Sequence, residues 1–133
     1  MDTDETRMDK KMGLKYEEVT RDILGAAFEV YNVLGYGFLE KVYQKAMQVE
    51  LLRLNHTAEL EHPITVKYKG TIVGEYAADI FVDKKVIVEL KVASEYNRKD
   101  EAQLLNQLKA TGIDVGLLIN FGCKQVEFNR FVY

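Results

Sequence analysis

A chain of 133 residues, of which 47% are hydrophobic and 29% charged, has the length and composition of one globular domain with a single core. Its net charge of −3 argues against a general basic face for binding nucleic acid. No apolar run approaches the ~20 residues that span a bilayer, and the acidic start does not resemble a signal peptide, so we expect a cytoplasmic protein with no membrane partner.

The first helix is expected to begin after a charged segment. Residues 1–14 have many charges and little apolar periodicity, which predicts a flexible tail, and the single domain is then expected over 15–133. From Tyr16 to about Val33, apolar residues recur at steps of three and four, which predicts an amphipathic helix. The glycines that follow fit a helix end and a turn.

A second helix is predicted over residues 39–54. Its apolar row is expected to consist of Leu39, Tyr43, Met47 and Leu51. Glu40 falls in its first turn, where the helix dipole favours a carboxylate by about 0.3–1 kcal/mol. Stabilising the helix end is therefore an alternative role for Glu40, beside any role in a functional site.

The rest of the chain predicts a mixed sheet with one more helix. Pro63, the only proline, is tolerated at a strand edge or start, and the pair at 69–70 is a turn signal. The third helix is expected to turn Leu104, Leu105 and Leu108 toward the core. The predicted order is two helices, three strands, one helix and two strands, which is an α+β fold. The extended segments are expected at 58–61, 64–68 and 71–73, followed by a hairpin at 76–90. The third helix is expected at 101–110, and the last strands at 115–121 and 126–132.

The hairpin at 76–90 is the segment best suited to chemistry. If the polar tripeptide 83–85 is its loop, Val82 faces Val86 and, counting back along both strands, Asp79 lies opposite Glu89. Opposed residues have Cβ atoms about 4.5–5.5 Å apart, and like charges there destabilise the sheet. A divalent cation between the two carboxylates would offset this repulsion. Another loop length would shift the register and move Asp79 out of line.

Alternation along the strand places Lys91 on the same face as Glu89, with Asp79 joining them. A Glu-x-Lys pair on an exposed face is also an ordinary surface ion pair, and this interpretation stays open. The sole cysteine, Cys123, has no zinc-ligand spacing to either histidine and is expected to be buried or half-buried. Basic residues grouped in the second half could form a local basic rim, namely Lys67, Lys69, Lys84, Lys85, Lys91, Arg98, Lys99 and Lys109.

Two motifs carry a resemblance to a known family. Residues 37–43 read Gly-Phe-Leu-Glu-Lys-Val-Tyr, matching Gly-x-x-Glu-x-x-Tyr, and Asp79 is followed ten residues later by Glu-Leu-Lys at 89–91. The chain thus resembles the GxxExxY proteins, a group similar to the PD-(D/E)xK nuclease superfamily, from about Tyr16 to its end. Each motif is weak alone, but together, in the order helix, hairpin, helix, they are fairly specific.

The resemblance implies a restriction-endonuclease-like mixed β-sheet flanked by helices. It implies that Asp79 and Glu89 bind Mg²⁺ or Mn²⁺, that Glu40 is a further acidic ligand or orienting group, and that Lys91 assists catalysis. Mg²⁺ prefers oxygen ligands and typically takes one or two carboxylates plus a substrate phosphate oxygen. The chemistry therefore suits these residue types.

The third helix resembles the Gln-x-x-x-Tyr element of some exonuclease-like members, which makes Gln103 a further candidate catalytic residue. The tyrosine of that element is Gln107 here, which puts in doubt whether this helix contacts substrate in the usual way. The proline before the motif aspartate is replaced by Ala78, a minor departure.

These features favour a metal-dependent nuclease that hydrolyses nucleic-acid phosphodiester bonds. DNA is the preferred partner, and a homodimer is left open because enzymes this small often need two copies to engage two strands. Two alternatives remain. One is a binding or regulatory module that keeps the nuclease fold with little or no catalysis, motivated by the acidic charge and by Gln107. The other is a structural or assembly protein that acts through its first two helices.

Overall fold

The computed structural model describes residues 15–95 and 97–133, so the tail expected at 1–14 lies outside the described residues. In the described part the chain forms three helices and five strands in the predicted order. They are α2 (Glu17–Leu34), α3 (Glu40–Arg53), β1 (Ala58–Tyr68), β2 (Thr71–Val82), β3 (Val86–Lys91), α4 (Arg98–Thr111), β4 (Val115–Asn120) and β5 (Glu127–Val132).

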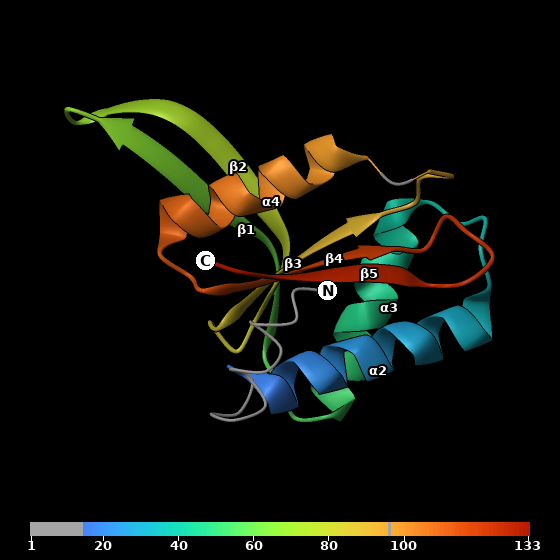
Figure 1. Cartoon of the computed structure of the whole chain (residues 1–133). Helices are drawn as coiled ribbons and strands as arrows, with labels where there is room; N and C mark the ends of the chain where they lie inside the picture. Colours follow the sequence, from blue (N-terminus) through green and yellow to red (C-terminus); the bar gives the residue numbers. More distant parts are fainter. Residues whose placement is uncertain (1–14, 96) are drawn as a thin grey trace, which may run out of the picture.

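The strands form one mixed sheet in the order β1-β2-β3-β4-β5, so each strand lies beside its neighbour in sequence. β3 and β4 are parallel, with α4 as the connection between them, and the other pairs are antiparallel. Figure 1 shows α2 and α3 on one face of the sheet and α4 on the other. This arrangement confirms the α+β prediction.

Side-chain alternation divides the core into two layers. Val82, Val86 and Val88 face α2 and α3 and belong to the larger cluster. Phe81 and Ile87, on the opposite face of the same hairpin, pack in a smaller cluster that includes leucines of α4. Burial of each large apolar side chain stabilises the fold by about 1.5–3 kcal/mol. The odd-numbered positions of β3, which include Glu89 and Lys91, are therefore on the α4 face of the sheet.

The extended segments predicted at 58–61 and 64–68 form a single strand, β1. Glu61, at the end of the first segment, has a φ of 53°, and the ladder with β2 omits this residue but continues on either side. Pro63 is accommodated because β1 is an edge strand, where a missing N–H leaves no neighbour unpaired.

Two predicted helix details were wrong. Leu39 precedes α3 and is exposed, whereas Tyr43, Met47 and Leu51 are buried as expected. On α4, Leu105 is 37% exposed and Gln107 is fully buried beside the sheet. A helix turns 100° per residue, so with Leu104 and Leu108 facing the sheet the third inward position is Gln107. Periodicity of apolar residues alone could not detect a buried glutamine.

The hairpin loop has the predicted length. Val82 pairs with Val86, and Lys85 N donates to Val82 O at 2.9 Å. Asp83 and Lys84 both have positive φ, at 53° and 55°, a conformation that carries a steric cost for residues other than glycine. Asp83 is held there by Thr57, whose N–H donates to Asp83 Oδ1 at 2.8 Å.

His56 ties this loop to the first helix. Its Nε2 lies 2.7 Å from Asp22 Oδ2 on α2, and its Nδ1 lies 2.5 Å from Asp83 Oδ2. Burial alone would lower the pKa of His56, but hydrogen bonds to Asp22 and Asp83 more than compensate and raise the pKa above 6.5. The charged imidazole therefore joins α2, the turn after α3 and the hairpin loop.

The His56 contacts make stability depend on pH. The pKa of His56 is higher in the folded state than in the unfolded state. The stabilisation that its hydrogen bonds supply is therefore complete below the unfolded-state pKa and is lost as the pH rises through the folded-state pKa. We expect His56→Gln to lower the free energy of unfolding by about 1.5–3 kcal/mol near pH 6 and by less near pH 9. Chemical denaturation across this range checks it. Parallel profiles for wild type and His56→Gln would contradict the assignment.

Candidate functional site

The β2–β3 ladder ends just before the two acids of the hairpin. Backbone pairing stops at Ile80 and Val88, and the next two N–H groups donate to side chains instead. Asp79 N donates to Glu89 Oε1 at 3.3 Å, and Leu90 N donates to Asp79 Oδ2 at 2.7 Å. Asp79 and Glu89 therefore lie across from each other, as the loop count predicts, but carboxylates take the place of backbone carbonyls in the ladder.

The Glu89 carboxyl is the most perturbed acid near this break. Its residue is 3% exposed. Burial, and after it the charge of Asp79, raise the pKa of Glu89 to about 8, against smaller opposing effects from the Asp79 N–H, Gln107 and Lys91. A free carboxyl has a pKa near 4.5. In the protein without a cation, Glu89 therefore holds a proton at neutral pH because two acids crowd a dry site.

Asp79 is half-buried, and burial raises its pKa, with Glu61 adding to the effect. The N–H of Leu90 and the positive charges of Lys91 and Lys41 oppose this rise. The Asp79 carbonyl is satisfied by Gln44, whose Nε2 donates to it at 2.8 Å. Gln44 lies one turn after Glu40 on α3, and its i, i+4 spacing from Glu40 was the signal that could have identified it.

Glu40 approaches the pair from the first turn of α3, as predicted. Burial raises the pKa of Glu40, the charge of Asp79 raises it further, and Lys91 lowers it. Glu40 therefore lies within electrostatic range of Asp79 and Lys91. The start of α3 and the β2–β3 hairpin, which are distant in the sequence, contribute these groups.

Tyr43, the tyrosine of the Gly-x-x-Glu-x-x-Tyr pattern, has a structural role in this arrangement. Its ring stacks on Phe121 with centroids 4.5 Å apart and planes within 5°. Its hydroxyl donates to Gly35 O at 2.7 Å and accepts from Phe38 N at 3.3 Å. Tyr43 thus fixes the turn before α3 on the core, and this turn directs Glu40 toward Asp79.

Lys91 is half-buried at the end of β3, and its Nζ lies 3.6 Å from Asp100 Oδ1 in the first turn of α4. Asp100 was not among the predicted site residues. Its position in a first helical turn, shortly after the Glu-Leu-Lys segment, was a weak signal at most. The ion pair holds the ammonium group beside the carboxylates.

The predicted candidate on α4, Gln103, is half-buried one turn before Gln107. In the part of the chain that the structure describes, no hydrogen bond or ion pair joins Gln103 to Asp79, Glu89 or Lys91. Gln107 lies closer to the centre, next to Glu89, whose pKa it lowers. Neither amide atom of Gln107 has a hydrogen bond of normal geometry, which is unusual for a fully buried side chain.

The donor set suits a cation in a limited way. Within residues 15–95 and 97–133, no three His, Cys, Asp or Glu side chains form a group arranged to hold a metal ion. Two adjacent carboxylates nevertheless fit Mg²⁺, which takes one or two carboxylates and completes its coordination with water and phosphate oxygens. Asp79 and Glu89 are that pair, and Glu40 as a third ligand stays a prediction.

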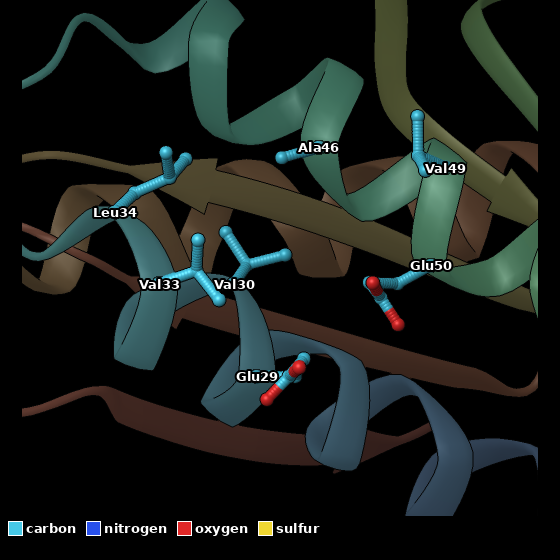
Figure 2. A pocket seen from close by; sticks show the side chains of 7 residues that line it. All are labelled: Glu29, Val30, Val33, Leu34, Ala46, Val49 and Glu50. Atoms are coloured by element: carbon cyan, nitrogen blue, oxygen red, sulfur yellow. The ribbon is translucent and has the colours of Figure 1, made fainter.

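A separate hollow of about 250 Å³ lies between α2 and α3. Figure 2 shows its apolar walls and, at one end, two glutamates. None of the predicted site residues lines it. Its lining consists of Glu29, Val30, Val33, Leu34, Ala46, Val49 and Glu50.

Comparison with known proteins identifies the family of the chain. None of the helices in the described ranges is long and apolar enough to span a bilayer. The search of curated proteins found no match. A sequence model of the PD-(D/E)XK nuclease superfamily matches residues 17–131, a range that includes α2, α3, α4 and the acidic hairpin. The chain belongs to the PD-(D/E)XK nuclease superfamily.

Proposed function

We propose that this protein is a nuclease that uses Mg²⁺ or Mn²⁺ to hydrolyse phosphodiester bonds in nucleic acid, with DNA as the preferred substrate. The observation that carries the proposal is the Asp79–Glu89 pair, two acids fixed against each other where the ladder opens. We also infer that the chain falls within the GxxExxY group, because Glu40 and Tyr43 have distinct and complementary roles in holding this site.

The raised pKa values of both acids support a cation. Burial and mutual repulsion raise the pKa of Glu89 to about 8, so its ionised form is strongly disfavoured when no positive charge is present. A divalent cation would reverse this preference, because opposite charge favours the ionised form. The pair is thus arranged to be stable as carboxylates only when a cation lies between them.

Each side chain has a distinct role in the proposed reaction. A bound divalent ion supplies Lewis acidity and an activated water. Asp79 and Glu89 hold it through oxygen ligands, and Glu40 orients water on the α3 side. Lys91 places a positive charge beside the scissile phosphate, where negative charge increases in the transition state.

One observation favours the non-catalytic alternative. Lys91 already has a partner in Asp100, 3.6 Å away, so its charge is partly neutralised before substrate binds. A module that only binds nucleic acid would keep this pair intact. In the nuclease, the phosphate competes with Asp100 for the ammonium group.

The carboxylate variants test the metal role. We expect Asp79→Asn and Glu89→Gln each to abolish Mn²⁺ binding, measured by titration calorimetry, and cleavage of nucleic acid in Mg²⁺ or Mn²⁺, because each removes a charged ligand. Glu29→Gln is the matched control, since it removes an exposed carboxylate on α2 and leaves the pair unchanged. Nuclease activity that persists unchanged in Asp79→Asn would contradict the assignment.

The variant Lys91→Ala distinguishes a role in stabilising the transition state from a role in binding the metal. Mn²⁺ affinity should hold or rise because a positive charge near the site is removed, while turnover should fall by about 10²–10³, the loss typical for one preorganised stabilising group. Single-turnover cleavage and calorimetry on the same preparation check both. Full activity in Lys91→Ala would exclude the proposed role.

Glu89→Gln should also stabilise the metal-free fold. The folded-state pKa of about 8 exceeds the ordinary value of 4.5, so wild type loses stability as pH rises between these values, whereas the amide does not ionise. We expect the free energy of unfolding of Glu89→Gln to exceed that of wild type by about 1–3 kcal/mol near pH 8. This difference should vanish below about pH 4.5. Denaturation in EDTA measures it, and Glu75→Gln on an exposed position should show no such gain. A gain that does not depend on pH would point to packing instead.

A further inference from the structure

The first hairpin of the sheet extends well beyond the rest of the molecule. We call residues 65–75, at the far end of β1 and β2, the arm. Figure 1 shows it projecting at the upper left, past the last turn of α4. All residues from 67 to 73 are exposed, so no other described element covers its tip.

The arm is basic in an acidic protein. The arm carries Lys67 and Lys69 against one acid, Glu75 at its base, whereas the chain as a whole has a net charge of −3. Lys69 Nζ lies 5.4 Å from the centroid of the Tyr68 ring. Tyr68 is 62% exposed, Ile72 50% and Val73 62%. Cations that alternate with exposed apolar groups suit a surface that contacts phosphates together with sugars and bases.

The backbone of the arm is well defined. Lys69 and Gly70 form its two-residue turn, with φ of 48° and 83°, and Tyr68 pairs with Thr71. A register shift between Val66 and Lys67 leaves an extra residue on β2, and such a bulge increases the twist of a ribbon. The lysines are thus held on a twisted, hydrogen-bonded scaffold.

A two-stranded ribbon has the width to enter one kind of groove. The major groove of B-form DNA, about 12 Å wide, admits a β-ribbon, whereas the major groove of A-form RNA is too deep and narrow for side chains to read. The shape and charge of the arm therefore match duplex DNA better than duplex RNA. Single strands offer no groove at all.

The arm is also rigidly connected to the acidic pair. Strand β2 carries Thr71 at the tip of the arm and Asp79 at the site. At about 3.3 Å per residue, these positions are roughly 26 Å apart along the strand, a distance of about 8 base pairs at 3.4 Å each.

We propose that the arm enters the major groove of duplex DNA about 8 base pairs from the bond held at Asp79 and Glu89. Lys67 and Lys69 then contact phosphates on the walls of the groove. This inference rests on the proposed function and specifies double-stranded DNA as its substrate.

The test compares two double variants of equal charge. Lys67→Ala/Lys69→Ala changes the arm, and Lys45→Ala/Lys124→Ala removes two lysines elsewhere. Each is combined with Asp79→Asn so that no cleavage occurs, and binding to a fluorescein-labelled DNA duplex of about 24 base pairs is measured by fluorescence anisotropy. We expect the arm variant to lose about tenfold in affinity and to reduce the slope of log K against log salt by about 2. The control should bind like its parent.

Other nucleic acids test whether the arm acts only on long duplex DNA. A DNA hairpin with a stem of about 5 base pairs is too short to reach from the site to the arm, so both variants should bind it equally. Duplex RNA and single-stranded DNA should be bound more weakly and without dependence on the arm. Equal losses in both variants, or an arm effect on every probe, would overturn the proposal.

The failure of this inference is distinguishable from failure of the proposed function. Arm-dependent DNA binding without cleavage by wild type in Mn²⁺ would refute the nuclease and leave the arm in place. If the arm variant cleaves long duplexes as well as wild type does, the proposed role of the arm is refuted and the nuclease assignment stands. Sedimentation of both variants completes the test, because a loss of self-association with unchanged DNA binding would make the arm a contact between copies of the chain.

Discussion

The site depends on one irregularity of the sheet: side-chain carboxylates accept hydrogen bonds that backbone carbonyls of the neighbouring strand would normally accept. Asp79 Oδ2 accepts from Leu90 N, and Glu89 Oε1 accepts from Asp79 N. Buried N–H groups must have partners, so neither acid can leave without exposing an unsatisfied donor. The fold thereby holds two acids together in a dry site, where burial and the charge of Asp79 keep Glu89 protonated at neutral pH. A cation at this site would favour the ionised form of both acids.

Elements around this pair fix its geometry from separate directions. Gln44 satisfies the Asp79 carbonyl that the open ladder leaves free. The Tyr43–Phe121 stack anchors the turn from which Glu40 extends. At the other end of the hairpin, His56 and Asp83 keep a loop of positive-φ residues closed, and this loop sets the register of both strands. A slip of one residue would move Glu89 to the opposite face of the sheet.

Local patterns in the sequence were sufficient to predict the order of elements, the three-residue loop and the alignment of Asp79 with Glu89, because each follows from short-range periodicity and turn chemistry. Contacts between distant segments were less accessible. The burial of Gln107 depends on how α4 rotates against the sheet, and the Lys91–Asp100 pair depends on where that helix begins. The exposed ribbon at 67–73 reads as an ordinary strand pair, since a sequence does not reveal what fails to cover it.

The parallel pairing of β3 with β4 bears on how the chain assembles. The acidic hairpin and its two flanking turns are local contacts, which form readily, whereas β4 must wait for α4 to cross the sheet. Asp79 and Glu89 thus come together first in a solvated hairpin, where water screens their repulsion. Burial of Glu89 against α4 then requires the crossover to be in place, so the pKa of this carboxyl is a property of the whole sheet and not of the hairpin alone.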